Sequence, residues 1–420
     1  MSSAVARWAD LAVVRNVQYR RLLAARTVWL LGSAVAPIAL AFAVLGLRRG
    51  SPSELGIVLA SRSIGQVAFL LIGGVLADRF SRYRVMVASD MLAGAAQAGV
   101  AALFISHHAT LAALIALSTI NGAAAALFYP ASASVVPQVV DMKDLQPANA
   151  LLRMSTNASA IAGAVAAGVL IAAIGSGWAI AADAASFFAS ALLLVGLRIA
   201  LAPQSAARGG MLEDLRHGWR EFRSRTWVWV TVLQFSLLNA CFAGGINVLG
   251  PVVAQRHYGG AAGFSALRAC QAAGFLGGSF VALRLRPRRP LRLATVATFT
   301  FVAPLLLLAA AAPLWLVAAA MTVDGVCSDI FEVLWSVALQ TNIPDEALSR
   351  VNSYDALGSL ALGPLGMATA GPVAEGIGVT ETLIAGGVLA GAATAAALTS
   401  RSVRSLTAGP HPPPDPPPQQ

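Results

Sequence analysis

Apolar runs of about twenty residues recur along the chain and are separated by short polar segments. This length suits a helix that crosses the hydrocarbon core of a bilayer. Lipid restricts spanning segments to helices or closed barrels, and barrel strands would show alternating segments of about ten residues. The pattern therefore predicts an all-α membrane protein with twelve transmembrane helices. They are expected at 22–46, 53–77, 84–105, 109–132, 151–174, 177–197, 227–251, 260–283, 291–312, 314–339, 354–374 and 379–399.

The longest hydrophilic stretch, residues 198–226, follows the sixth predicted helix and divides the chain into two halves. The charged loop at 78–84 has a counterpart at 284–292, which indicates two parallel six-helix repeats. We expect an interfacial segment, two six-helix bundles joined by a central cytoplasmic loop, and a disordered proline-rich tail. Their predicted bounds are 1–21, 22–197, 198–226, 227–400 and 401–420.

Charge is scarce and unevenly distributed. Only 11% of the residues are charged, yet the net charge is +10. In a soluble protein such a balance would suggest nucleic acid. Here 29 residues are basic, and all but Arg48, Arg49, Arg62, Arg256 and Arg268 fall on the side of the predicted helices that holds the N-terminus. The positive-inside rule then places both termini in the cytoplasm and makes the lipid bilayer, with no nucleic acid, the expected partner.

The chain shows no constellation typical of an enzyme. Its five histidines lie in predicted loops or in the tail, and its three cysteines lie in apolar runs without a C-x-x-C partner. No G-x-x-x-x-G-K-[ST] motif for ATP is present. We therefore expect no catalytic residues, no metal site, no cofactor and no ATP-driven pumping.

Three segments carry a family resemblance. Gly74, Asp78, Arg79 and Arg82 follow the order Gly-x-x-x-Asp-Arg-x-x-Arg, which resembles the loop between helices 2 and 3 of the major facilitator superfamily. The blocks at 128–151 and 334–355 resemble its drug- and siderophore-exporter branch, which includes macrolide-efflux and enterobactin-exporter proteins. The resemblance implies the major facilitator fold, a monomer in the plasma membrane (a bacterial inner membrane), and alternating access to a central cavity lined by helices 1, 4, 7 and 10.

The same resemblance implies a cytoplasmic gate. In the family, the loop aspartate lies near the start of helix 11 and holds the two halves together on the inner side. We therefore expect Gly74, Asp78, Arg79 and Arg82 to form this gate with two residues at the start of helix 11, Arg350 and Asp355. The alternative is a solvated positive loop.

Polar residues within the predicted spans are candidates for function, because a charge at mid-bilayer costs about 2.5–3.5 kcal/mol on insertion scales. Asp324, Asp329 and Glu332 fit on one face of helix 10, about 140° wide. Clustered carboxyls in a low dielectric suit proton loading and release. The alternative is that one or two of them pair with arginines or with polar neighbours.

Arg62 and Arg268 occupy nearly equivalent places in helices 2 and 8, each with a glutamine nearby. They could meet the helix 10 acids or anionic groups of a substrate; the alternative is snorkelling towards the outer headgroups. Further residues could line a substrate cavity, or could simply make contacts between helices. They are Ser33, Asn121, Gln234, Asn239 and Trp335.

These expectations lead to a secondary transporter that exports a small amphipathic compound, such as an antibiotic, a siderophore or another metabolite, in exchange for protons. The glycine-proline pair typical of helix 5 in exporters is missing here, where Gly163-Ala164 stands instead. A proton-coupled importer of the same fold therefore stays open. A membrane scaffold or sensor without transport activity is a further alternative.

Overall fold

The computed structural model describes residues 12–48, 50–79, 82–197 and 219–407. Within these ranges it describes the backbone but not the side chains at 12, 70–79, 82, 129–131, 133–134, 143, 345–346 and 349. All regular structure in the described part of the chain is helical. The prediction of an all-α protein is confirmed.

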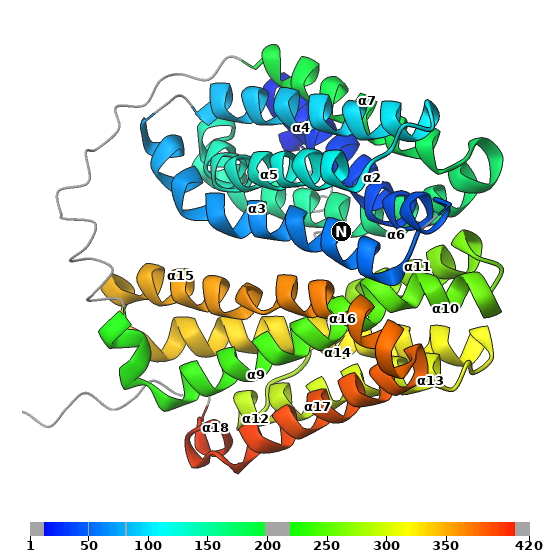
Figure 1. Ribbon diagram of the computed structural model, residues 1–420. Helices are drawn as coiled ribbons and strands as arrows, with labels where there is room; N and C mark the ends of the chain where they lie inside the picture. The colour runs from blue at the N-terminus through cyan, green and yellow to red at the C-terminus, as the bar shows by residue number, and fades with distance from the viewer. Residues whose placement is uncertain (1–11, 49, 80–81, 198–218, 408–420) are drawn as a thin grey trace, which may run out of the picture.

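The first half consists of six long helices (upper bundle in Figure 1). They are α2 (Val17–Leu45), α3 (Pro52–Arg79), α4 (Arg82–Ile105), α5 (Leu111–Val139), α6 (Leu145–Ile174) and α7 (Ser176–Val195). Short 3₁₀ turns precede α2 at Ala12–Arg15 and α6 at Met142–Asp144. Helix α2 begins five residues before its predicted start, because the Asn16 side chain accepts hydrogen bonds from the Gln18 and Tyr19 amides and caps it there.

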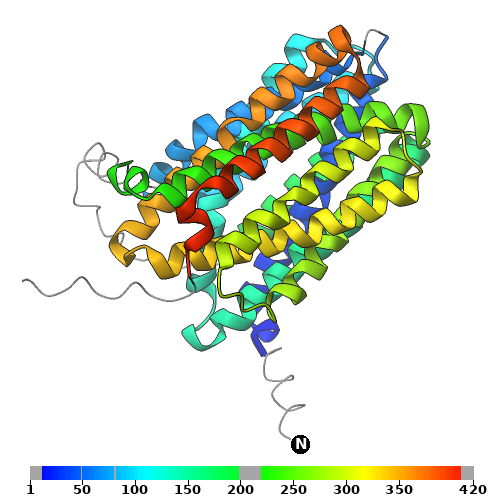
Figure 2. The same ribbon diagram turned by 90° about the horizontal axis from the view of Figure 1, so that it is seen from below.

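The second half also forms a bundle, seen from below in Figure 2, but several of its spans are interrupted. The continuous helices are α11 (Ala261–Ala282), α14 (Leu314–Asn342) and α17 (Val379–Thr399), followed by the short α18 (Arg401–Ser405). The interrupted spans combine α9 (Thr226–Phe242), the π segment η3 (Ala243–Leu249) and α10 (Gly250–His257); then α12 (Pro290–Ala297), the 3₁₀ segment η4 (Thr298–Phe301) and α13 (Val302–Ala309); and finally α15 (Asp345–Ala361) and α16 (Gly363–Ile377).

In the described residues, ten helical stretches are long and apolar enough to cross a membrane. Helices α3 and α11 have 28 and 22 residues and pack alongside them, but each contains an arginine, Arg62 or Arg268. Arginine lowers the hydropathy of a span without preventing it from crossing when the charge faces protein. The number twelve for the transmembrane helices stays a prediction.

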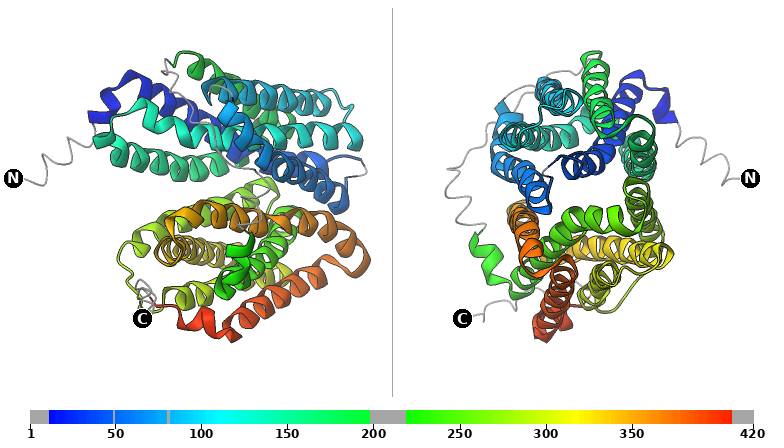
Figure 3. Two further views of the ribbon diagram at one scale, coloured as in Figure 1. Left: turned by 90° about the vertical axis from the view of Figure 1, so that its left-hand side faces the viewer. Right: turned by 45° about the vertical axis from the view of Figure 1, so that its right-hand side comes forward.

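The two bundles lie against each other mainly through two pairs of helices (left view of Figure 3). Helix α3 of the first half packs on α16, and α6 packs on α11. Helices α3 and α11 are the second spans of their halves, whereas α6 and α16 belong to the fifth. Each interface therefore joins a second span to a fifth span of the other half. Such reciprocal contacts are what two parallel repeats predict.

The hydrophobic cores differ between the two ends of the molecule. We call the end where α2 begins and α17 ends the terminal end, and the opposite end the far end. At the far end, one cluster of buried side chains includes Val44 and Leu55 of the first half together with Leu249 and Leu267 of the second. At the terminal end, each half has its own cluster. Among the described side chains, the halves thus share a core at the far end and have separate cores at the terminal end.

Close backbone contact accompanies the joined core. A Cβ atom built on Gly56 of α3 would collide with the Met367 carbonyl oxygen of α16, and one built on Gly371 would collide with the backbone of Pro52 and Ser53. Glycine at these two positions lets the α3 and α16 backbones meet directly, as small residues commonly do between membrane helices.

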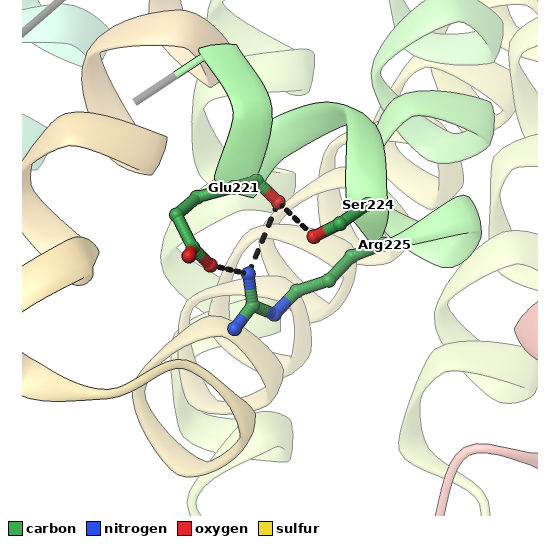
Figure 4. Close-up of polar contacts among 3 residues, drawn as sticks. All are labelled: Glu221, Ser224 and Arg225. Atoms are coloured by element: carbon green, nitrogen blue, oxygen red, sulfur yellow. Dashed lines mark hydrogen bonds and ion pairs between the residues drawn. The ribbon is translucent and has the colours of Figure 1, made fainter. Parts of the chain in front are cut away.

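At the terminal end, an ion pair lies just before α9. The Arg225 guanidinium contacts the Glu221 carboxylate one turn earlier and also donates to the Glu221 carbonyl oxygen at 3.0 Å (Figure 4). The Ser224 hydroxyl donates to the same carbonyl at 2.8 Å. Both charged side chains are partly exposed, so this pair stabilises the turn by only about 0.3–0.5 kcal/mol.

Candidate transport site

The most buried acid of α14 is Asp324. Its side chain is wholly buried, and its Oδ2 accepts a hydrogen bond of 2.9 Å from Nε2 of Gln271 on α11. The Gln271 Oε1 atom in turn accepts from Nη1 of Arg268 at 2.6 Å. The second oxygen, Oδ1, is buried and has no hydrogen-bond partner among the described residues. Arg268, Gln271 and Asp324 thus form a chain of hydrogen bonds with one open carboxyl oxygen at its end.

The other two acids of α14 lie nearer the terminal end. Asp329 is half-buried and accepts a hydrogen bond of 2.8 Å from the Ser279 hydroxyl of α11. Glu332 is exposed and within electrostatic reach of Asp355 on α15. Arg153, from α6 of the other half, is within electrostatic reach of both Asp329 and Glu332. These two acids face the interface between the halves, whereas Asp324 is enclosed between α11 and α14.

In the first half, the Arg62 side chain of α3 is tied to α5. Its Nε donates to Asn121 Oδ1 at 2.9 Å, and the Asn121 amide donates to the Ala93 carbonyl at 3.4 Å. Asp183 of α7 is wholly buried and within electrostatic reach of Arg62. The contacts of Arg62 with Asn121 and Asp183 thus lie inside the first bundle.

Backbone contacts relate these two sites to each other. A Cβ atom on Gly122 of α5 would meet the Arg62 carbonyl oxygen of α3. A Cβ atom on Gly325 of α14 would meet the Gln271 carbonyl oxygen of α11. Helices α5 and α14 are each 29 residues long, and these two glycines occupy the same position in them. The two halves therefore place Arg62 and Gln271 at equivalent points of the helix crossing.

A second pair of glycines gives the same alignment. Gly65 of α3 lies against the Thr119 carbonyl, and Gly274 of α11 lies against the Thr322 carbonyl. Both glycines follow three residues after Arg62 and Gln271, respectively. Two independent contacts thus agree on the register.

The equivalence extends to the side-chain pairs. Arg62 with Asn121 in the first half corresponds to Gln271 with Asp324 in the second. The ionisable member is thus a base on the second span of the first half and an acid on the fourth span of the second half. From the sequence, Arg268 was expected to be nearly equivalent to Arg62. In the structure it lies about one helical turn before Gln271, the residue equivalent to Arg62.

Three of the expected cavity residues make hydrogen bonds within the second bundle. The Gln234 amide donates to the Thr298 hydroxyl at 2.7 Å and the Thr394 hydroxyl at 3.3 Å. Asn239 donates to the Ser359 carbonyl at 3.0 Å. Trp335 is buried, and its indole donates to Asp355 at 2.9 Å. Such contacts between helices are what we expected if these residues do not line a cavity. A role of the three residues in substrate binding stays a prediction.

Two further expected cavity residues lie in the first half. Asn121 is buried in its contact with Arg62, as described above. Ser33 on α2 is half-buried, and its hydroxyl oxygen has no hydrogen-bond partner among the described residues. This oxygen is buried, and the proposed role of Ser33 in substrate binding also stays a prediction.

Most of the predicted cytoplasmic gate lies outside the described residues. This holds for the side chains of Asp78, Arg79 and Arg82 and for the surroundings of Gly74, although α3 ends at Arg79 and α4 begins at Arg82. Arg350 is half-buried on α15. Asp355 accepts hydrogen bonds from Trp335 and from the Ser359 hydroxyl, both of its own half. The gate therefore stays a prediction.

The sequence analysis missed two acids. Asp90 of α4 is buried; it accepts a hydrogen bond of 2.6 Å from the Ser190 hydroxyl and leaves its Oδ1 unpaired among the described groups. Glu375 of α16 accepts a hydrogen bond from the Ser53 amide of α3, across the interface of the halves. Each is a single acid within an apolar run, and this pattern would have marked both as candidate functional residues.

Comparison with known proteins identifies the family. The family model of the Major Facilitator Superfamily matches residues 22–367, most of the chain. The chain belongs to the major facilitator superfamily. It is thus a multi-pass membrane transporter by family, not an enzyme, and the fold predicted from the three motif blocks is confirmed.

Curated relatives are exporters. The chain is 28% identical over 310 residues to the Enterobactin exporter EntS of Citrobacter koseri, covering 71% of this chain and 73% of the relative. It is 27% identical, with the same coverage, to the Enterobactin exporter EntS of an Escherichia coli O1:K1 strain. These relatives agree with the predicted drug- and siderophore-exporter branch.

Solved structures of transporters share the fold. A crystal structure of the nucleoside transporter NupG aligns with a TM-score of 0.72 at 15% identity, covering 91% of this chain and 98% of that one. A bacterial homologue of the human lysosomal transporter Spinster, in an inward-facing and unoccupied conformation, aligns with a TM-score of 0.69 at 17% identity, covering 92% and 98%. At these identities the likeness concerns the fold alone.

Proposed function

We propose that this protein is a proton-coupled exporter of a small amphipathic compound in a bacterial inner membrane. The family supplies the general activity, transport of small molecules across the membrane. The similarity to enterobactin exporters supports export and makes a siderophore the first substrate class to test, ahead of antibiotics and other metabolites.

The arrangement of the hydrophobic cores supports alternating access. Because the described side chains form a core shared by both halves at the far end and separate cores at the terminal end, rocking the halves about the α3–α16 and α6–α11 contacts would open one end as it closes the other. The basic residues gather at the terminal end, so the positive-inside rule makes that end cytoplasmic. The structure then corresponds to a state that is closed towards the outside.

The burial of Asp324 and its unpaired carboxyl oxygen are the main support for proton coupling. A buried charged carboxylate is costly unless all its oxygens are paired, and here Oδ1 has no partner among the described groups. A proton removes the charge and can reside on that oxygen. In the proposed cycle, Asp324 takes a proton from outside water as substrate leaves, and releases it to inside water before substrate binds again.

Two alternatives differ from this proposal in distinct ways. An importer would use the same fold and the same carboxyl, with substrate and proton moving together. A scaffold or sensor would have no transport, and the open Asp324 oxygen counts against it because buried polar atoms in proteins are normally paired.

Transport into inverted membrane vesicles decides between export and import. Vesicles that contain the protein should accumulate radiolabelled enterobactin, or a compound found by susceptibility profiling of a deletion strain, when the vesicle lumen is made acidic, so that protons leave as substrate enters. Asp324→Asn should abolish this accumulation, whereas the matched variant Glu381→Gln, an exposed acid on α17, should retain it. Accumulation only in right-side-out vesicles would establish import and overturn the proposal.

A further inference from the structure

The hydrogen bonds around Asp324 give Gln271 a particular position. Its side-chain amide lies between a cation and an acid, accepting from Arg268 with its oxygen and donating to Asp324 with its nitrogen. An amide is neutral and cannot titrate. Arg268 and Asp324 are therefore linked through a neutral group instead of forming a direct ion pair.

A direct ion pair would have a different consequence for the acid. A guanidinium in contact with a carboxylate holds it in the charged form. With Gln271 between the two groups, Asp324 keeps one oxygen on a neutral donor and the other oxygen open. Gln271 thus leaves Asp324 able to exist in both protonation states.

The first half of the molecule provides an internal comparison. There an arginine, Arg62, occupies the position of Gln271, and its partner is Asn121, which cannot carry a proton. In each half, one member of the pair is an amide and the other is charged. Of these two equivalent pairs, the one with a titratable member is the pair in which glutamine occupies the position on the second span; Asp183 of α7, which is within electrostatic reach of Arg62, belongs to neither pair.

We propose that Gln271 is the positioning residue that keeps Asp324 titratable, by holding the Arg268 guanidinium away from it. Glutamine at the α11 position gives a proton-carrying site, and arginine at the equivalent α3 position gives a fixed charge. Proton coupling then resides in the second half of the molecule, and the first half contributes a permanent positive charge. This inference rests on the proposed function, because it assigns the residue that sets the proton affinity of the same carboxyl.

Few other groups can affect the protonation of Asp324. Among the described residues, the titratable or charged groups within reach of it are Arg268 on α11 and the Cys327 thiol on its own helix. The η4 segment places the uncharged Thr300 beside Cys327. Replacement of Gln271 therefore changes the main contact of Asp324 without a second charged neighbour to compensate.

The test replaces the glutamine with the residue found in the other half. Infrared difference spectroscopy of the purified transporter follows the carbonyl stretch of a protonated carboxyl during a pH titration, and Asp324→Asn identifies the Asp324 band by its loss. In Gln271→Arg, the midpoint of this band should move to lower pH by about 1–3 units. The control is Gln340→Arg, at an exposed glutamine near the end of α14, the helix that contains Asp324. This variant should leave the midpoint unchanged.

A double variant shows whether an arginine at position 271 is compatible with folding. Gln271→Arg combined with Asp324→Asn rebuilds in the second half the pair that Arg62 and Asn121 already form in the first, so this variant should fold and should lack the band. Substrate exchange should persist in it, while proton-driven accumulation should be lost. An unchanged midpoint in Gln271→Arg would overturn the inference about Gln271. The band is measured without transport, so this failure is distinct from an absence of proton-driven export, which would overturn the proposed function.

Discussion

Glu375 on α16 accepts a hydrogen bond of 3.2 Å from the backbone amide of Ser53, at the start of α3. The carboxylate lies at the N-terminus of a helix that belongs to the other half, where the helix dipole favours a negative charge. The predicted cytoplasmic gate has the reciprocal arrangement, with an acid near the end of α3 and the start of the eleventh span. Helix α3 and the eleventh span would thus have a carboxylate contact for each closed state, with α16 at the far end and, in the predicted gate, with α15 at the terminal end.

We expect Glu375→Gln to weaken closure of the far end. An exposed charge at a helix N-terminus contributes about 0.3–1 kcal/mol, which corresponds to a roughly two- to five-fold change in the ratio of the two states. Spin labels at His108 and Trp315, both exposed at the far end of opposite halves, would report this as a larger fraction of long distances. Glu381→Gln is the control, and an equal shift in both variants would contradict a specific role for Glu375.

The glycine contact between the same helices gives a second prediction. A methyl group at Gly371 would push α3 away from α16, and overpacking of this kind costs about 1–3 kcal/mol. Gly371→Ala should therefore reduce the rate of transport and favour the state open at the far end. Gly376→Ala has no atom within 4 Å of the new Cβ and should behave like the wild type. Equal transport rates for the two variants would show that the contact is not needed for closure.

Asp90 tests whether every buried carboxyl couples to protons. It lies between α4 and α7 of the first half and is hydrogen-bonded to Ser190, without a basic residue among its described contacts. We expect Asp90→Asn to retain proton-driven transport, because the amide preserves the shape and the contact with the hydroxyl. Asp90→Ala should lower the free energy of unfolding by about 1–3 kcal/mol, measured by thermal denaturation in detergent. Loss of proton coupling in Asp90→Asn would move the coupling site to the first half.

Sequence was sufficient for the fold because runs of membrane length are a strong signal and because the basic loops follow one side of the bundle. It also contains a short repeat that marks the paired sites. Thr119-Ile120-Asn121-Gly122 recurs as Thr322-Val323-Asp324-Gly325, and the shared Thr-x-Asx-Gly order marks the same crossing in both halves. This repeat would have singled out Asp324 among the three acids of its helix.

The partners of these residues could not be predicted in the same way. Whether Arg268 or Gln271 contacts Asp324 depends on how α11 crosses α14, and one turn of difference selects a different side chain. Gln234 and Trp335 sit on predicted cavity helices, but helical rotation directs both into their own bundle. Periodicity predicts which residues share one face of a helix. Which side chains of other helices that face contacts depends on the packing of the whole bundle.

The central claim is that Asp324 couples substrate movement to protons, and reconstituted transporter tests it most directly. Proteoliposomes with Asp324→Asn would be compared with wild type for two activities, exchange of labelled for unlabelled substrate and accumulation driven by a proton gradient. We predict that the variant retains exchange, because substrate binding and the rocking of the halves do not need the proton, and that it loses gradient-driven accumulation. Accumulation at the wild-type level in Asp324→Asn would contradict the account.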